Sequence, residues 1–240
     1  MRAITEAYLR KQFREETPTC FTLEAGMLLT PAARQYLQDR RIDVLTDEKA
    51  GSGSKQGTSR MSYTALDSGR RYDKKPEDMT QLHGRTLVRK DHLRIQLRGR
   101  LDSLQSDILL LHARCASVAP DVTADLIELL GWTREILRAE VLETAPAELS
   151  LSGMTAAELR ERSHNPKKFY GIGHVLPDVD MRLEVLELNK LRSTVREIEL
   201  VAVAAMADGK HPGGQQIIET LNRMSSGIYV LMLQHITRMP

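Results

Sequence analysis

Apolar residues in the C-terminal two thirds of the chain recur at alternating steps of four and three. This spacing places them on one face of an α-helix. Three helices with such an apolar face, which we call a seam, follow one another along the chain. A fourth helix, ending near residue 142, is predicted between the first two. The seams are Leu97, Leu101, Leu104, Ile108, Leu111, Cys115 and Val118; then Leu188, Leu191, Val195, Ile198, Ala202 and Ala205; then Ile217, Leu221, Met224, Ile228 and Leu231. Four long amphipathic helices pack most simply as an antiparallel bundle.

A shorter helix and a separate N-terminal module complete the predicted architecture. Thr155 and Glu158 form a capping box that opens a short helix, so the fold class is an all-α five-helix bundle. The N-terminal stretch differs, because a helix capped by Thr30 and Pro31 lies between two short strand-like runs. We therefore expect a small α/β docking module over residues 1–46, a flexible linker over 47–78 and the bundle domain over 79–240.

The amino-acid composition argues against several classes of binding partner. The chain has 34 Lys and Arg against 32 Asp and Glu, which is too balanced for a general nucleic-acid binder. No long apolar stretch predicts a membrane span, and the charged N-terminus predicts no secretion signal. The two cysteines are too few for a disulfide framework or a thiolate metal cluster. We expect a cytoplasmic protein with no protein-held metal, no membrane contact and no nucleic-acid partner.

Polar residues form a stripe beside two of the seams. Arg192, Arg196 and Glu199 are spaced by four and three, so they lie on one edge of the third long helix. Two guanidinium groups there could bind phosphate, although a solvated face with Arg–Glu pairs within the helix would have the same spacing. Asn222 and Tyr229 mark a similar stripe on the last helix, where small residues could equally serve helix packing.

Six basic residues are concentrated between positions 85 and 100, namely Arg85, Arg89, Lys90, Arg94, Arg98 and Arg100. A polyanion patch is one interpretation, but no aromatic residues are interleaved for base stacking. A phosphate-binding loop that leads into a helix is the interpretation we favour.

Taken together, six segments resemble the corrinoid adenosyltransferases, most closely the ethanolamine-utilisation type. The resemblance runs over most of the chain through LTPAARQYLQDRRIDV, KKPEDMTQL, RGRLDSLQSDIL, the HNP and HVLPD region, LNKLRSTVREIE and LNRMSSGIYVLML. It implies a homotrimer with active sites between subunits. There the 5′-deoxyadenosyl group of ATP, accompanied by Mg²⁺, would pass to cob(I)alamin.

The resemblance also implies roles for particular residues. Lys90, Arg196 and Asn222 match residues that hold ATP, and Glu199 matches an acidic residue of the same stripe. Arg192 matches an arginine that pairs across the subunit boundary with an aspartate at the position of Asp102. Arg192 and Arg196 are thus the expected catalytic residues.

His174 is the expected residue at the lower face of the corrinoid. It begins a His-Val-Leu-Pro segment that is similar to a Phe-x-Leu-Pro segment of propanediol-type relatives. A loop histidine that only bonds the backbone is the alternative.

Two departures limit what the resemblance implies. The segment SYTALDSGRRYDKKP lacks the histidine and the Cys-Cys-x-x-Cys cluster of well-known ethanolamine-type members, so we expect no iron or zinc requirement. The Gly-Asp-x-Gly phosphate loop of propanediol-type relatives is also missing.

The implied role is to supply adenosylcobalamin to a B12-dependent lyase, ethanolamine ammonia-lyase in the first instance. The N-terminal module would dock to that lyase or to a microcompartment shell. A non-enzymatic corrinoid carrier or assembly scaffold of the same pathway is the alternative function.

Overall fold

The computed structural model describes residues 2–13, 18, 20–23, 27–40, 42–46, 62–116 and 119–237. The chain divides into two compact units, one up to Arg60 and one from Met61 onward. None of the helices in the described ranges combines the length and apolar character that crossing a membrane requires.

The N-terminal unit is a small α/β fold, as the sequence predicts. Two pairs of parallel strands accompany two helices, namely β1 (Arg2–Ile4), α1 (Glu6–Gln12), β2 (Cys20–Leu23), β3 (Met27–Leu29), α2 (Pro31–Asp39) and β4 (Asp43–Thr46). The Thr30 side chain accepts a hydrogen bond from the Ala33 amide and Pro31 begins α2, so the predicted cap is confirmed. Leu9, Ala33 and Leu37 are among the residues of a separate small core.

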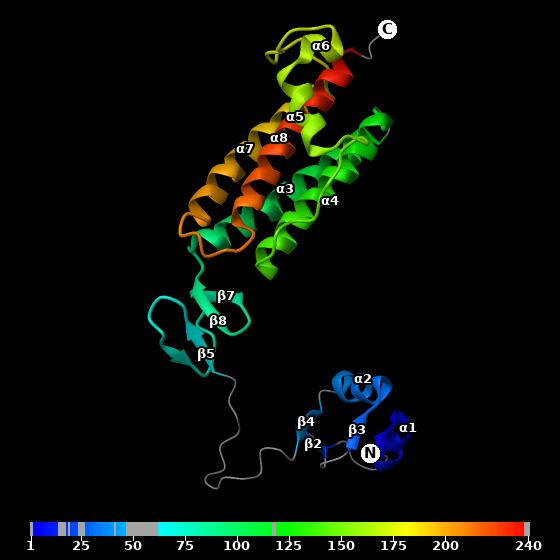
Figure 1. Cartoon of the computed structure of the whole chain (residues 1–240), viewed down its shortest axis with the longest axis vertical. Coiled ribbons are helices and arrows are strands. Elements are labelled where there is room, and N and C mark those ends of the chain that lie inside the picture. Colours follow the sequence, from blue (N-terminus) through cyan, green and yellow to red (C-terminus); the bar gives the residue numbers. More distant parts are fainter. Residues whose placement is uncertain are drawn as a thin grey trace. The chain divides into compact units, whose positions relative to one another are not determined.

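The bundle consists of four long helices that run side by side (Figure 1). They are α3 (Leu93–Cys115), α4 (Pro120–Leu142), α7 (Leu183–Ala205) and α8 (Gly214–Thr237). Every seam residue that the structure describes is buried, so the predicted bundle is confirmed. The core is aliphatic, with Trp132 as one of its few aromatic side chains.

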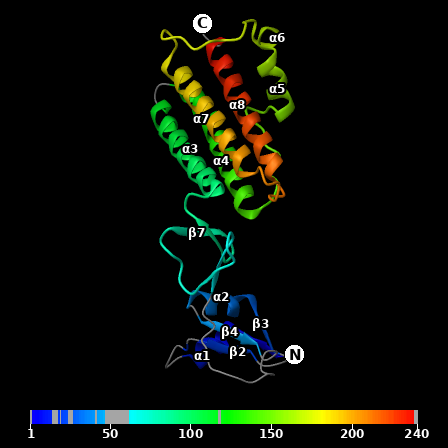
Figure 2. The ribbon, with the colours of Figure 1, turned by 90° about the vertical axis from the view of Figure 1, so that its left-hand side faces the viewer.

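Two short helices, α5 (Ala156–His164) and α6 (Pro166–Tyr170), pack beside α8 (Figure 2). The capping box between Thr155 and Glu158 is present at the start of α5. Gly227 allows α8 to lie this close, because a Cβ there would meet the Cδ2 atom of Leu151 at 2.7 Å. Gly227 of α8 therefore serves close packing against the segment that leads into α5.

A four-stranded sheet that the sequence pattern does not predict precedes the bundle. Its strands are β5 (Tyr63–Ala65), β6 (Arg71–Tyr72), β7 (Met79–His83) and β8 (Thr86–Arg89), in the order β6-β5-β8-β7. The linker prediction for 47–78 is therefore wrong from residue 63, and residues 47–61 lie outside the described ranges. The strands have two to five residues, too few for alternation to stand out, and their core is only Ala65, Met79 and Leu87 with flanking tyrosines.

Candidate active site

A cavity of about 380 Å³ lies where α5, α7, α8 and the loop after α6 meet. Three of the predicted site residues, His174, Arg192 and Arg196, line it together. The full lining is Ser163, His164, His174, Val175, Leu176, Arg192, Arg196, Ser225, Ser226 and Tyr229. The periodicity of α7 explains why Arg192 and Arg196 lie at the cavity. Each directly follows a buried seam residue, Leu191 or Val195, and so lies at the edge of the buried face of the helix.

The two arginines give this cavity an uncompensated positive charge. Burial, and next the neighbouring charge of Arg196, lower the pKa of the Arg192 guanidinium. Among the described residues no carboxylate forms an ion pair with Arg192 or Arg196, so the predicted alternative of Arg–Glu pairs within the helix does not hold here. A pair of guanidinium groups without a counter-charge suits an anionic ligand.

Tyr229 organises the loop that carries His174. The ring of Tyr229 stacks on the ring of His174, with centroids 6.2 Å apart and an interplanar angle of 14°. Its hydroxyl lies 3.4 Å from Nδ1 of His174 and accepts a hydrogen bond of 2.9 Å from the Val175 amide. The guanidinium of Arg192 lies 5.3 Å from the centre of the same ring. The His174 ring is thus held in place by an aromatic side chain of α8.

Glu199 and Asn222 form a polar pair across α7 and α8. The Asn222 side-chain amide donates a 2.9 Å hydrogen bond to Oε1 of Glu199. Glu199 forms no ion pair with Arg196 one turn earlier. The pair lies within the same stripe as the arginines but does not line the cavity.

Asp102 does not reach Arg192 within one chain. Arg114 on α3 bonds Glu187 on α7 at 3.1 Å, which sets the register of these antiparallel helices. Asp102 precedes Arg114 by twelve residues and Glu199 follows Glu187 by twelve, so Asp102 is level with Glu199. Arg192 lies seven residues from that level, roughly 10 Å along the helix axis.

Lys90 also lies away from the cavity. It sits between β8 and α3, is exposed, and donates its backbone amide to the Asp78 carbonyl at 2.9 Å. The neighbouring Asp91 and His92 line a different cavity, together with Ala204 at the end of α7. One chain therefore brings together only part of the predicted site.

Part of the basic cluster before and within α3 forms ion pairs inside the chain. Arg94 and Arg98 both bond the buried Glu140, and Arg89 bonds Asp91 at 3.1 Å. Arg94 and Arg98 are therefore structural, whereas Arg89 has an exposed side chain and its phosphate-binding role stays a prediction. Sequence reasoning missed Glu140 because its partners lie more than 40 positions away.

No group of three or more His, Cys, Asp or Glu side chains is placed to hold a metal ion in the part of the chain that the structure describes. Cys115 is buried in the bundle core, and burial is the main cause that raises the pKa of its thiol. Cys115 is thus a packing residue.

Comparison with known proteins places these features in a family. Residues 72–235 match the family model described as cobalamin adenosyltransferase, and residues 3–56 match the corrinoid adenosyltransferase EutT N-terminal domain. The corrinoid adenosyltransferases EutT of Escherichia coli strain K12 and of Salmonella typhimurium are 27% identical to the chain over 252 residues. That alignment covers 99% of this chain and 93% of theirs.

A solved structure shares the fold. It is a single-residue variant of a PduO-type ATP:corrinoid adenosyltransferase from Lactobacillus reuteri, complexed with cobalamin and ATP. It matches with a TM-score of 0.52 and 15% sequence identity, over 66% of this chain and 91% of that chain. The matched family model covers more than half of the chain, and the chain belongs to the cobalamin adenosyltransferase family.

Proposed function

We propose that this enzyme transfers the 5′-deoxyadenosyl group of ATP to cob(I)alamin, using the cavity between α5, α7 and α8. The observation that carries the proposal is the convergence of Arg192, Arg196 and His174 on one cavity, with no acidic partner for either arginine among the described residues. An anion is the ligand that such a cavity favours, and ATP supplies one.

The arginines would stabilise the leaving group. In the reaction the cobalt of cob(I)alamin donates an electron pair to C5′, the Co–C5′ bond forms, and the C5′–O5′ bond breaks as the triphosphate leaves. Charge develops on the phosphate oxygens, and Arg192 and Arg196 are placed to neutralise it. Mg²⁺ bound to the triphosphate would share that charge. Cob(I)alamin is itself a strong nucleophile, so no protein nucleophile is required.

The Glu199–Asn222 pair would complete the ATP contacts on α7 and α8. One side-chain N–H of Asn222 is bonded to Glu199. Its second side-chain N–H and its side-chain oxygen, Oδ1, stay available to a ligand. His174, stacked on Tyr229, would form the floor against the lower face of the corrinoid and keep water from the cobalt.

A second copy of the chain would supply Lys90 and Asp102. Neither residue reaches the cavity in its own chain, so the site needs a neighbour to be complete, and a homotrimer with sites between subunits fits this need. Exposed leucines and a valine on the outer faces of α3 and α7 support such assembly, because apolar side chains exposed on neighbouring helices favour subunit contact. These are Leu93, Leu109, Leu110, Leu200 and Val203.

The cellular role that we propose rests on the resemblance to ethanolamine-utilisation adenosyltransferases. The enzyme would supply adenosylcobalamin to ethanolamine ammonia-lyase in the cytoplasm, and the N-terminal unit would dock to that lyase or to a microcompartment shell. No observation favours the alternative of a carrier or scaffold, which would have no need of a triphosphate site formed by Arg192 and Arg196.

Anaerobic incubation with ATP, Mg²⁺ and chemically reduced cobalamin tests the activity directly. Absorbance should change from the spectrum of cob(I)alamin to that of adenosylcobalamin, and omission of ATP should abolish the change. A protein that binds the corrinoid without this conversion would support the carrier function instead.

A further inference from the structure

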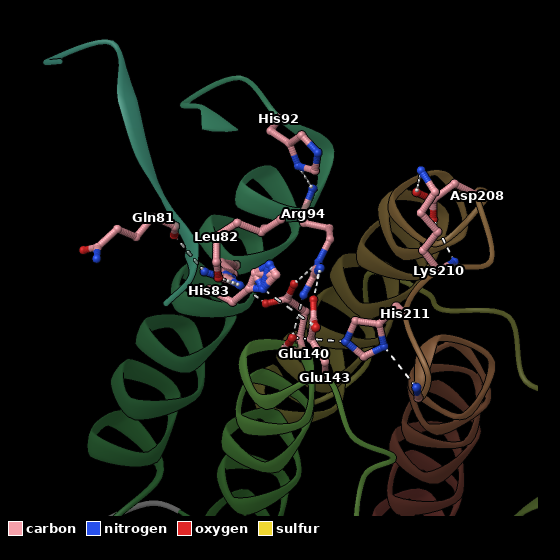
Figure 3. A network of polar contacts seen from close by, with 12 residues as sticks. Gln81, Leu82, His83, His92, Arg94, Glu140, Glu143, Asp208, Lys210 and His211 are labelled. Carbon is pink, nitrogen blue, oxygen red and sulfur yellow. Dashed lines mark hydrogen bonds and ion pairs between the residues drawn. The ribbon is translucent and has the colours of Figure 1, made fainter. Parts of the chain in front are cut away.

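Glu140, near the end of α4, is completely buried between two arginines of α3 (Figure 3). Its Oε1 accepts a 2.6 Å hydrogen bond from Nε of Arg94, and its Oε2 accepts from Nε of Arg98. The main-chain carbonyl of Glu140 accepts a hydrogen bond from Nη2 of Arg94 at 2.9 Å. Nη1 of Arg94 donates to Oε1 of Glu143 at 2.6 Å. Two positive and two negative groups thus compensate each other, with Glu140 completely buried and Glu143 at the partly exposed edge of the cluster.

This cluster extends from the bundle into the small sheet. Arg98 donates from Nη2 to the Leu82 carbonyl at 2.8 Å and from Nη1 to the Gln81 carbonyl at 3.4 Å. Both carbonyls belong to β7. Arg98 is therefore a bridge, with one side of its guanidinium on Glu140 and the other on the sheet.

Packing alone does not hold the sheet on this side. A cavity of about 590 Å³ lies between the sheet, the start of α3 and the loop that joins α7 to α8. Leu82 and Arg94 line this cavity. Arg94 bonds Glu140, and the Leu82 carbonyl accepts from Arg98. Polar contacts therefore help to place β7 at this partly hollow junction: the two bonds from Arg98, and a contact of 3.8 Å between Nδ1 of His83 and Oε2 of Glu143.

Lys90 depends on the position of this sheet. It directly follows β8, which pairs with β7 from Thr86 to Arg89, and its own amide bonds the Asp78 carbonyl at the start of β7. A shift of β7 against the bundle would therefore carry Lys90 with it.

We propose that Glu140 is a positioning residue: it orients Arg98, which holds the sheet and so sets where Lys90 meets the phosphates of ATP. This inference rests on the proposed role of Lys90. The charge cluster around Glu140 lies far from the cavity that Arg192 and Arg196 line. It would affect ATP binding through Lys90.

The test uses full-length Glu140→Gln, which keeps the size of the side chain and removes its charge. Hydrogen–deuterium exchange of the amides in 79–90 should speed up by about tenfold, since local opening becomes easier without the anchor. Arg98→Lys is the second variant, because lysine keeps the charge but cannot bond Glu140 and Leu82 together. Glu135→Gln on the same helix, whose partner Arg138 is exposed, is the matched control and should leave this exchange unchanged.

Kinetics of the same variants give a readout that a purely structural role would not move. The KM for ATP should rise by about tenfold with a smaller change in kcat and in the KM for cobalamin, as expected for lost substrate binding. In a Lys90→Ala background, Glu140→Gln should add less than about twofold, because both changes act through one contact.

Unchanged exchange in 79–90 for both Glu140→Gln and Arg98→Lys would overturn the proposal. So would fully additive effects of Glu140→Gln and Lys90→Ala on the KM for ATP. If Lys90→Ala alone leaves that KM unchanged while exchange in Glu140→Gln rises, Lys90 is not the residue that Glu140 positions, and the proposal fails although adenosyl transfer by the enzyme stands.

Discussion

Arg196 offers the clearest single-residue test of the cavity, because it lines the cavity and has an exposed side chain that no described carboxylate pairs with. We expect Arg196→Ala to lower kcat by about 10² to 10³, the usual effect of removing one preorganised charge donor. Thermal unfolding should stay close to that of the wild type, since no internal ion pair is broken. Lys190→Ala, an exposed cation on the same helix but outside the cavity, is the control. Activity of Arg196→Ala within a few-fold of the wild type would rule out the proposed role.

His174 tests the corrinoid face of the same cavity. The stack on Tyr229 holds the His174 ring in one orientation, with Nδ1 near the Tyr229 hydroxyl. We expect the ring to act as a plate rather than as a cobalt ligand, because donation from Nε2 would stabilise Co(II) and oppose reduction. His174→Phe should keep or raise activity from cob(II)alamin, whereas His174→Ala should lower it by admitting water. Both variants should approach the wild type when cob(I)alamin is supplied already reduced. Equal rates for His174→Ala and the wild type with both substrates would place His174 away from the corrinoid.

At the scale of elements, the loop between α7 and α8 is fixed to the end of α4. The Gly213 amide donates to Nδ1 of His211 at 3.1 Å, so Nε2 carries the hydrogen and donates to the Glu140 carbonyl at 3.1 Å. Gly213 lies against the chain after α4, where a Cβ would meet the Thr144 carbonyl oxygen at 2.0 Å. The sharp return of the chain into α8 therefore requires glycine.

We expect Gly213→Ala to lower the free energy of unfolding by about 1–3 kcal/mol, because backbone atoms must move apart to admit the methyl group. Gly131→Ala is the matched control, since Gly131 is exposed on α4 with open space around its Cβ position. That substitution should raise stability by roughly 0.5–1 kcal/mol through better helix propensity. Chemical denaturation of both variants measures the difference, and equal stability of the two would show that the loop can relax.

At the scale of the whole molecule, the register of α3 against α7 argues for an oligomer. Asp102 is level with Glu199 of its own chain, so the pair with Arg192 that we propose would form only between two chains. If Asp102 and Arg192 pair between subunits, Arg192→Ala should weaken assembly, because breaking a partly buried ion pair costs about 3–5 kcal/mol. Sedimentation should then show smaller species, and activity should fall with assembly.

A charge exchange makes this test specific. Asp102→Arg alone should dissociate the oligomer, and adding Arg192→Asp should restore its size though not its activity. A monomeric wild type with full activity at working concentration would contradict the assembly that we propose.

Periodicity in the sequence was enough to determine the bundle. Steps of four and three persist over many turns, so each seam specified one buried face, and helices of this length have few other ways to bury it. The small sheet escaped prediction because its short strands are stabilised by pairing between segments rather than by a repeating local pattern. Residue type and helical spacing likewise put Arg192 and Arg196 on one stripe.

What only the tertiary structure decided is which arginines are free to bind a ligand. In the sequence Arg94 and Arg98 appear as basic as Arg192 and Arg196, yet Glu140 and Glu143 neutralise the first pair from 42 to 49 positions away. The second pair has no such carboxylate among the described residues, and burial lowers the pKa of Arg192. A guanidinium is a ligand site or a structural brace according to what folds against it, and that depends on contacts between distant segments rather than on local sequence.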